Sequence, residues 1–422
     1  MSVKLSLNVE GPEISVITAH GRQQLVSHKD ERLIEVLNRN NVPWSAVSIY
    51  QRNENDKTIR LCSGLEKRMS EFDADELLLY FNRNVNPFKF SPDNFRIIPS
   101  VDDEKQSTEY IYQNLQNSDA TAQSYLKKLT PEECQTIIAQ RVADTIKENM
   151  PEGAHLVVGV SGGGDSNAML HGLSLIRDYV HIHPVIIMGI PDWDKGVPRA
   201  KALCEKYQFN LKVFDENEVK SLLGIPPDSE SLIDRFERHF VGDDFEFLGT
   251  LLIRLSLTRY ARELNTTYIS TGLNLEDVLC ENLYRVSTGL KPASCPARKI
   301  GDMTLVMPLW MCPKRIIDGC FPKYSLDNYE ARYPCFSLGR NLYYSVIYTL
   351  QSGYPGFPEQ MARGLSLLAE QNPVEYHLDE QLGFYVERMV PLALRHQFKK
   401  MLSDARGESL DEQAEEILRT QH

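Results

Sequence analysis

The sequence predicts an α/β protein built on a doubly wound parallel sheet, with a small α+β module before it and a helical region after it. Two observations predict this class. The apolar run 155–160 ends at a glycine-rich turn and is followed by apolar residues at helical spacing. Three further strand-like runs, 185–190, 211–214 and 267–271, alternate with helical segments. Such alternation is typical of parallel sheets that bind ligands at the carboxyl ends of their strands.

Composition limits the class of protein. The 422 residues are enough for two or three domains, and 42% hydrophobic and 25% charged residues are values of an ordinary globular protein. No apolar run approaches the roughly 20 residues that span a bilayer, and no signal-like segment opens the chain. Eight cysteines are too few for a disulfide scaffold. We therefore expect a cytoplasmic protein without membrane contact. The net charge of −12 argues against a surface coated for nucleic acid.

Residues 1–95 are predicted to form the small α+β module. Strand-like alternation appears on both sides of a Glu-Gly-Pro turn at 10–12, and a helical pattern and further strand-like runs follow at 33–37, 46–50, 58–62 and 76–80. This order resembles a β-grasp (ubiquitin-like) module, although any small α+β domain would give a similar pattern. A free sulfur carrier of this kind would end in Gly-Gly, whereas this segment continues into the chain. Docking of a partner protein or substrate presentation is therefore the favoured role.

The remaining segments follow in order. Polar residues 96–129 are expected to be a linker or a solvent-facing helix. Thr130, a proline and Glu133 form a helix start with a capping box, which opens the parallel-sheet domain at 130–335. Within that domain, the acidic stretch 216–247 is expected to be irregular. Residues 336–422 are expected to be helical.

The turn at residues 161–166 is the first candidate site. It reads Ser161, Gly162, Gly163, Gly164, Asp165 and Ser166. Glycines allow the main chain to approach a phosphate closely, and successive N–H groups form a concavity that binds anions. The Asp165 carboxylate could hold the magnesium ion that accompanies a polyphosphate. The alternative is an ordinary strand-to-helix turn.

Residues 158–166, VGVSGGGDS, resemble the SGGxDS signature of the PP-loop ATP pyrophosphatases. The resemblance implies that the loop binds the pyrophosphate end of ATP with Mg²⁺. It also implies that the α-phosphate is attacked, which gives an adenylated substrate and pyrophosphate. The Walker pattern GxxxxGK[ST] and its lysine are absent from this turn.

The second candidate site is residues 272–289. This stretch resembles the segment that tRNA-thiolating and tRNA-lysidine-forming PP-loop enzymes carry after their fourth strand. The positions that keep the pattern are Gly272, Asn274, Glu276, Asp277 and Gly289, while Leu273 replaces a polar position. The resemblance implies catalytic and magnesium-binding roles for Asp165 and Asp277. The alternative for Glu276 and Asp277 is simple stabilisation of a helix N-terminus.

Strand ends supply the remaining nucleotide contacts. Ser161, Met188 and Gly272 each follow a predicted strand, so we expect them at the same edge of the sheet. Residues 314–316, Lys-Arg-Ile, resemble a turn of the same subgroup whose basic residues point toward the substrate. Residues 285–340 hold nine Lys or Arg against four Asp or Glu. Such a segment would attract a polyanion or a phosphate-bearing substrate, and a solvated loop face is the alternative.

Cysteines raise the question of sulfur chemistry. The five at 280, 295, 312, 320 and 335 form no CxxC pair, so a zinc ribbon is not expected. Thiolating relatives with an iron–sulfur cluster carry CxxC near the start of the helix before the fourth strand, but 247–264 holds no cysteine. Cys335 lies near the position of a later cluster cysteine and could carry persulfide sulfur. The alternative is a small buried apolar residue.

These observations predict an ATP- and Mg²⁺-dependent enzyme that adenylates a substrate oxygen and then replaces it with sulfur or nitrogen. The resemblance of 272–289 favours tRNA as the acceptor. One alternative is an enzyme of the same chemistry that forms an amide, nitrile or thioamide on a small molecule, nucleotide or peptide. Another is a nucleotide-binding scaffold that docks a partner protein through residues 1–95.

Overall fold

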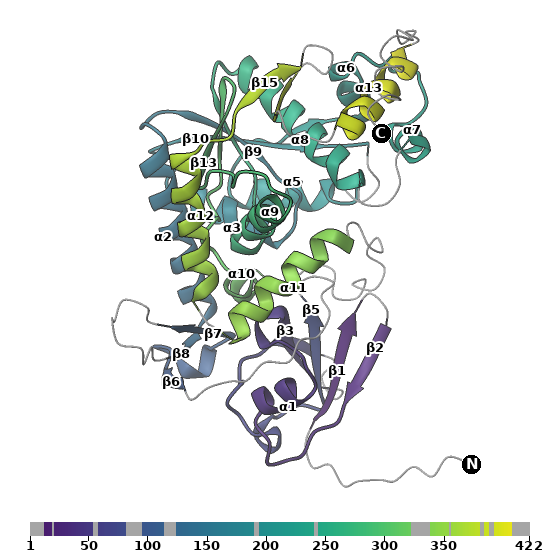
Figure 1. Ribbon diagram of the computed structural model, residues 1–422. Helices are drawn as coiled ribbons and strands as arrows, with labels where there is room; N and C mark the ends of the chain where they lie inside the picture. The colour runs from purple at the N-terminus through teal and green to yellow at the C-terminus, as the bar shows by residue number, and fades with distance from the viewer. Residues whose placement is uncertain are drawn as a thin grey trace, which may run out of the picture.

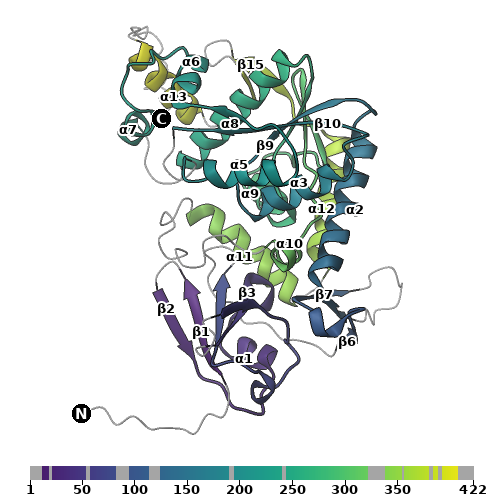
Figure 2. The same cartoon turned by 180° about the vertical axis from the view of Figure 1, so that it is seen from behind.

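The computed structural model places the parallel sheet in one part of the molecule and the N-terminal module in another, with helix α11 (Leu338–Gly353) between them (Figures 1 and 2). The structure describes residues 12–18, 21–53, 58–81, 95–113, 124–189, 194–239, 244–321, 338–353, 356–379, 384–387 and 392–406. Among these residues, no helix is both long and apolar enough to span a bilayer.

The central sheet confirms the predicted class. Its strands stand in the order β11-β10-β9-β12-β14-β13, and all neighbours pair in parallel except β13 and β14. The chain starts in the middle of the sheet and winds outward in both directions, which is the doubly wound arrangement. The strand bounds are β9 His155–Gly159, β10 His181–Ile187, β11 Lys212–Phe214, β12 Tyr268–Ser270, β13 Ala297–Ile300 and β14 Met303–Val306.

Helices cover both faces of this sheet because β9 is apolar on both sides. Leu156 and Val158 pack in one core with α2, α3 and α5, whereas Val157 packs in a second core with α8. The helix bounds are α2 Pro131–Asn149, α3 Gly164–Ser174, α5 Val197–Lys206, α8 Asp244–Glu263, α9 Leu275–Ser287 and α10 Lys314–Cys320. The predicted capping box of α2 is present, with Glu133 N–H donating to Thr130 Oγ1 over 3.1 Å.

The N-terminal module is a second, smaller sheet. Its strand order is β2-β1-β5-β3-β4, with β1 and β5 parallel and the other pairs antiparallel. The bounds are β1 Glu13–Thr18, β2 Gly21–Leu25, α1 Leu33–Arg39, β3 Val47–Asn53, β4 Thr58–Leu61 and β5 Glu76–Phe81, with 3-10 turns at Trp44–Ala46 and Met69–Glu71. The expected α+β order is present, although β2 was not predicted. The strand expected near residues 3–7 lies outside the described residues.

The expected linker at 96–129 is wrong. Strands β6 (Phe95–Ile98), β7 (Thr108–Gln113) and β8 (Ser124–Leu129) form a sheet of order β6-β8-β7, with a 3-10 turn at Asp103–Lys105. The apolar residues of these strands are too few to stand out among polar neighbours. The tertiary structure shows their role, because Ile111 and Leu126 are buried in the core of the N-terminal module.

Two other expectations need correction. The stretch 216–247 is helical, with α6 (Glu216–Leu222) and α7 (Leu232–His239) before α8. An Asp215–Glu218 capping box begins α6, and Phe236 of α7 is fully buried. The C-terminal region is helical in α11, α12 (Phe357–Gln371) and α13 (Leu392–Arg406). It also contains an unexpected hairpin of β15 (Tyr376–Asp379) and β16 (Phe384–Glu387).

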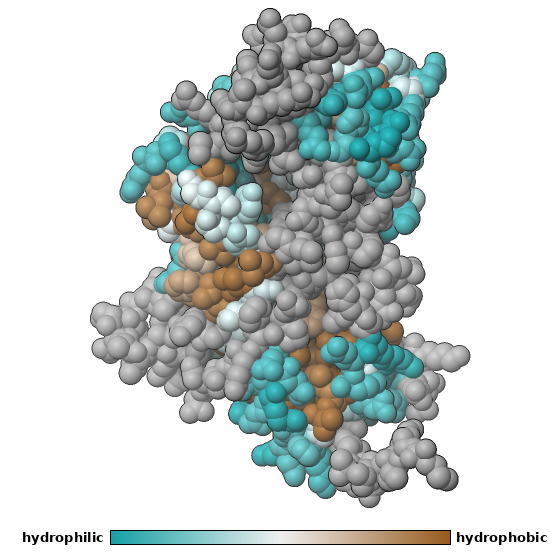
Figure 3. All heavy atoms as spheres, turned by 45° about the vertical axis from the view of Figure 1, so that its right-hand side comes forward, coloured by the Kyte–Doolittle hydropathy of each residue, from teal (hydrophilic) through white to brown (hydrophobic). Residues whose placement is uncertain are grey.

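The N-terminal module shares its core with the rest of the chain. Leu275 and Leu279 of α9 and Tyr344 of α11 are buried in the same apolar cluster as the residues of β1, α1 and β3. Ser45 Oγ donates to the Tyr348 carbonyl over 3.1 Å. Apolar side chains also reach the surface near the middle of one face, between the two parts (Figure 3). The module is therefore packed onto the molecule rather than tethered to it.

Candidate nucleotide site

The glycine-rich loop lies at the carboxyl edge of the central sheet. In register, Gly159 of β9 pairs with Val185 of β10, and Val158 pairs with Ser270 of β12. Because the strands are parallel, the residues that follow each strand emerge at one edge. Ser161, Met188 and Gly272 thus meet at this edge, as the sequence predicts.

Two of the three loop glycines are required by close packing. Gly162 has φ +77, and a Cβ there would lie 2.8 Å from the Gly196 carbonyl and the Ala200 amide nitrogen at the start of α5. A Cβ on Gly164 would lie 2.9 Å from the Phe321 carbonyl. Side chains at either position would push the loop away from α5 or from the end of α10.

Gly163 has a different role. Its φ of −87 suits any residue, and the nearest atom to a Cβ there is Ser161 Oγ at 3.6 Å. Gly163 is also the N-cap of α3, which has no side-chain cap hydrogen bond. The positive end of α3 therefore opens beside a position where nothing in the described chain demands a glycine. A phosphate approaching the main chain there would demand one.

Two serines brace the loop. The Ser161 N–H donates to Ser166 Oγ over 2.8 Å, and the two hydroxyl oxygens lie 3.2 Å apart. Ser166 is buried in the first turn of α3, whereas Ser161 is exposed. Ser166 therefore holds the shape of the loop, and Ser161 presents its hydroxyl to solvent at the sheet edge.

Asp165 lies beside the loop and is partly exposed, with 28% of its side-chain surface accessible. Its Oδ1 accepts a hydrogen bond from Lys314 Nζ over 2.9 Å and one from Asn274 Nδ2 over 3.4 Å. Both contacts use the same oxygen, so within the described residues Oδ2 is open to a cation. Gly272 packs against Asp165, since a Cβ on Gly272 would lie 3.7 Å from the Asp165 Cβ.

The second candidate segment begins α9 and is tied to the loop through Asn274. The Asn274 N–H donates to Asp277 Oδ2 over 3.2 Å, and the Asp277 N–H donates to Asn274 Oδ1 over 3.1 Å. Asp277 Oδ1 also accepts the Tyr344 hydroxyl hydrogen bond, and Asp277 is only 5% exposed. Both Asp277 oxygens are thus engaged in holding α9 and α11. The structure brings Asp165 and Asn274 together, and a metal-binding role for Asp277 stays a prediction.

Glu276 anchors the helix that carries Lys314. Its two carboxylate oxygens accept the Lys314 main-chain N–H over 3.0 and 3.2 Å. Burial raises the pKa of Glu276 to about 8. The acidic pair 276–277 therefore reaches two helices: Asp277 caps α9 and Glu276 holds the start of α10.

Asp318 is a site residue that the sequence did not reveal. It lies one turn after Lys314 on α10, with its Oδ1 3.4 Å from Lys314 Nζ, and it is 1% exposed. The i, i+4 spacing of a lysine and an aspartate is a common helical ion pair, so the pattern alone carried no functional signal.

The donor set fits magnesium bound together with a polyphosphate. Among the described residues, no group of three or more His, Cys, Asp or Glu is arranged to hold a metal by itself. Mg²⁺ commonly takes one or two carboxylates, waters and substrate phosphates rather than a cage of protein ligands. Asp165, with an open Oδ2 beside the N-terminal end of α3, meets that requirement.

Three arginines of the basic segment 285–340 point into the fold and not to an open surface. Arg285 makes two bonds to the Glu387 carboxylate at 2.6 and 2.7 Å, and Arg298 makes two to Glu281 at 2.7 and 2.9 Å. The Arg315 guanidinium donates to main-chain carbonyls of the N-terminal half of the chain. All three arginines are at least nine-tenths buried. Three of the nine positive charges counted in the sequence are thus buried, and two of these are paired with carboxylates.

The described cysteines lack the features of a reactive thiol. Cys280, Cys295 and Cys312 are buried, and burial raises the pKa of Cys295 to about 11 and that of Cys312 to about 12. Cys320 is partly buried, and its pKa is also raised. Cys335 lies outside the described residues, so its proposed sulfur role is not addressed by the geometry.

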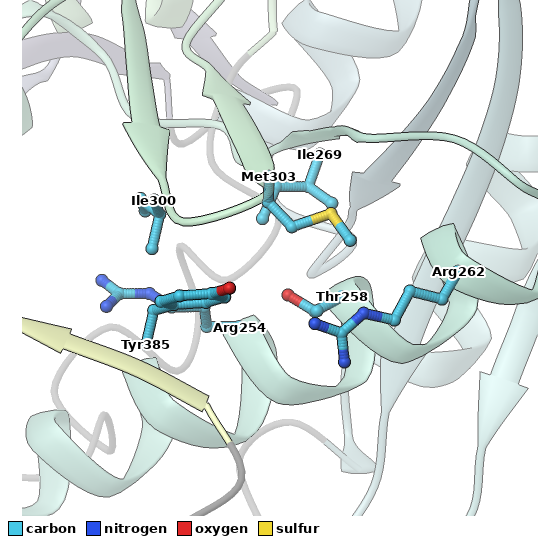
Figure 4. Close-up of a pocket in the computed structure, with 7 residues that line it drawn as sticks. All are labelled: Arg254, Thr258, Arg262, Ile269, Ile300, Met303 and Tyr385. Atoms are coloured by element: carbon cyan, nitrogen blue, oxygen red, sulfur yellow. The ribbon is translucent and has the colours of Figure 1, made fainter. Parts of the chain in front are cut away.

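A small pocket elsewhere is separate from this site (Figure 4). It lies between α8, the β13–β14 hairpin and β16, and is lined by Arg254, Thr258, Arg262, Ile269, Ile300, Met303 and Tyr385. Gly301 of the hairpin packs directly on the Tyr385 ring, and Arg262 pairs with Asp302 over 3.2 Å. The pocket is therefore a gap in the packing between the C-terminal hairpin and the β13–β14 hairpin.

Comparisons with known proteins give structural matches only. No family model and no curated protein sequence matches the chain. The U34-tRNA thiolase NcsA from Methanococcus maripaludis, solved with its [4Fe-4S] cluster, matches with a TM-score of 0.48 and 17% identity over 67% of this chain and 91% of that one.

Two synthetases match more loosely. The NH₃-dependent NAD synthetase from Campylobacter jejuni has a TM-score of 0.32 and 15% identity, over 60% of this chain and all of that one. The NMN synthetase from Francisella tularensis has a TM-score of 0.32 and 14% identity, over 56% of this chain and 96% of that one. All three proteins belong to the PP-loop ATP pyrophosphatase superfamily. These three TM-scores are below 0.5, so the likeness carries no argument about function.

Proposed function

We propose that this chain is an ATP pyrophosphatase of the PP-loop type. It binds Mg²⁺-ATP on residues 161–166 and transfers AMP to an oxygen of an acceptor. The acceptor oxygen attacks the α-phosphorus, the bond from that phosphorus to the bridging oxygen breaks, and pyrophosphate leaves. A nitrogen or sulfur nucleophile then displaces AMP. The observation that carries the proposal is the uncapped end of α3 at Gly163, with Asp165 beside it.

The chain contributes binding and electrostatics to this reaction. Main-chain N–H groups at the start of α3 and the Ser161 hydroxyl bind phosphate oxygens. Asp165 would hold a magnesium ion, whose chemistry there would be to neutralise the charge that develops on the departing pyrophosphate. Asn274 orients Asp165 through its side-chain amide. The attack on the α-phosphate needs no covalent intermediate with the protein.

Two acceptor classes are supported by different observations. The resemblance of residues 272–289 to tRNA-thiolating and lysidine-forming enzymes supports tRNA. The burial and pairing of Arg285, Arg298 and Arg315 supports a small molecule, nucleotide or peptide, because these arginines are not available to a polyanion. Mass spectrometry of tRNA and small metabolites from cells with and without the protein separates the two.

Magnesium-dependent nucleotide binding tests the proposal. Calorimetry with α,β-methylene ATP and Mg²⁺ should show binding by the natural protein and at least about a 100-fold loss for Asp165→Ala, because the metal ligand is gone. The control is Asp178→Ala, an exposed aspartate after α3, which should bind as the natural protein does. Equal binding by the Asp165 and Asp178 variants would overturn the assignment. Binding without pyrophosphate release on any acceptor pool would favour the nucleotide-binding scaffold instead.

A further inference from the structure

Lys314 places an ammonium group beside the glycine-rich turn at residues 161–166. Its Nζ is 2.9 Å from Asp165 Oδ1 and 3.8 Å from the position that a Cβ on Gly164 would take. The residue is 8% exposed, so its ammonium group is held between protein groups and not in solvent. The ammonium group is paired with the Asp165 carboxylate, which is also the group that would hold magnesium.

The surroundings fix the main chain of Lys314 and place the carboxylates of Asp165 and Asp318 within 3.4 Å of its ammonium nitrogen. Glu276 accepts the Lys314 main-chain N–H, and Pro313 precedes it as the N-cap of α10. Asp318 Oδ1 lies 3.4 Å from Lys314 Nζ, and Asp318 Oδ2 accepts the Ser48 hydroxyl hydrogen bond over 3.0 Å. Ser48 belongs to β3, so the N-terminal module supports the acid that positions this lysine.

We propose that Lys314 is an exchangeable cation of the nucleotide site, an inference that rests on the proposed function. In the empty site its ammonium neutralises Asp165. With Mg²⁺-ATP bound, Asp165 would hold the metal and the Lys314 ammonium would donate to a phosphate oxygen instead. Asp318 and Ser48 are positioning residues that keep the lysine within reach of both partners.

Charge explains why the exchange needs the nucleotide. A divalent cation on Asp165 repels an ammonium group held 2.9 Å from the same carboxylate. Mg²⁺ that binds without a nucleotide must therefore displace the Lys314 ammonium toward Asp318, and it brings no additional anion to which the ammonium could bind. Metal with ATP supplies phosphate oxygens, and the flexible four-carbon stem of lysine lets the ammonium reach them. The site thus favours the complex of metal and nucleotide over either one separately.

The test is a pair of opposite changes in Lys314→Met, which keeps an unbranched side chain one heavy atom shorter and removes its charge. Calorimetry should show Mg²⁺ alone binding about 5- to 10-fold more tightly, because its competitor for Asp165 is gone. Mg²⁺ with α,β-methylene ATP should bind about 10- to 100-fold more weakly, because a charged hydrogen bond to phosphate is lost. Loss of both affinities, or of neither, would overturn the inference.

Lys220→Met is the matched control. Lys220 of α6 is also a buried lysine, 4% exposed, but its Nζ donates to the Pro227 and Ser229 carbonyls in the turn after that helix. Its replacement should leave both affinities unchanged. If the natural protein binds no Mg²⁺-nucleotide at all, the proposed function fails. If it binds and only the Lys314→Met pattern is missing, the failure belongs to the exchange alone.

A second set of variants keeps the inference testable if Lys314→Met does not fold. Ser48→Ala removes the hydrogen bond to Asp318 and should weaken Mg²⁺-nucleotide binding about 3- to 10-fold, and Ser48→Thr should restore it. Ser45→Ala, in the same module but bonded to the Tyr348 carbonyl, is the control and should have no effect. Equal effects of Ser45→Ala and Ser48→Ala, or no rescue by threonine, would show a merely structural role and overturn the link to the N-terminal module.

Discussion

Replacing the loop glycines one at a time separates folding from phosphate binding. Gly162→Ala should destabilise the protein, because the new Cβ meets the start of α5 at 2.8 Å and the residue must keep φ +77. Gly163→Ala should leave stability nearly unchanged, since φ is −87 and the nearest contact is an ordinary 3.6 Å. It should nevertheless abolish nucleotide binding, because its Cβ occupies the side of the turn that the phosphate approaches.

The size of the Gly162 effect can be divided with a third variant. Gly153 has the same φ of +77, and nothing lies within 4 Å of a Cβ there. Gly153→Ala therefore measures the conformational cost alone, about 1–2 kcal/mol. Gly162→Ala adds the packing cost of a methyl group against main-chain atoms, about 1–3 kcal/mol. The expected total for Gly162→Ala is about 2–5 kcal/mol, which is a large part of the stability of a typical domain.

Urea unfolding and nucleotide calorimetry on the three variants check this reasoning. We expect the order Gly162→Ala, Gly153→Ala, Gly163→Ala from the largest to the smallest loss of unfolding free energy. Only Gly163→Ala should combine natural stability with lost binding of α,β-methylene ATP. A Gly163→Ala protein that binds the nucleotide normally would refute the phosphate position, and a Gly162→Ala protein no less stable than Gly153→Ala would refute the packing argument.

Three further results are expected. Arg315→Met should lower the unfolding free energy by about 3 kcal/mol or more, because the carbonyls of Glu109 and Trp44 lose a buried donor. Its control is Arg259→Met, which breaks an exposed pair with Glu263 and should change the unfolding free energy by about 0.5 kcal/mol or less. Equal losses of the two variants in urea unfolding would contradict this expectation. Glu276→Gln should flatten the pH dependence of stability between about pH 4.5 and 8. The raised pKa means that folded Glu276 keeps a proton which the unfolded chain has released, so the unfolding free energy of the natural protein falls by about 1.4 kcal/mol per pH unit across this window. If plots of unfolding free energy against pH run parallel for the two proteins, the pKa of Glu276 is not raised. Deletion of residues 1–95 should abolish cooperative unfolding of the remainder, because α9 and α11 lose the apolar core that they share with the N-terminal module. A two-state thermal unfolding transition of residues 96–422 with intact nucleotide binding would contradict this and would show that residues 1–95 form a separate domain.

Local sequence patterns were enough to predict an element where the residues that define it lie close together in the chain. The apolar run before Ser161 predicts β9, and the glycines after it predict the turn. Thr130 and Glu133 predict the start of α2, since a capping box needs only residues three apart. Strands β6, β7 and β8 were missed because their few apolar residues become decisive only on contact with a distant core. The C-terminal hairpin was missed for a similar reason, as β16 is held by Arg285, about a hundred residues earlier.

The amino-acid sequence by itself determined the parallel sheet, the glycine-rich turn after β9 and the presence of Asp165 in it, because strand, glycine and helix signals are short-range. Tertiary structure alone decided which groups face that aspartate. Lys314 and Asn274 come to Asp165 from 149 and 109 residues away, and Ser48 supports Asp318 from 270 residues away. It also decided that Arg285 and Arg298 are buried in ion pairs instead of open to a polyanion. The physical reason is that charge acts through space, so its effect depends on neighbours that the order of residues does not disclose.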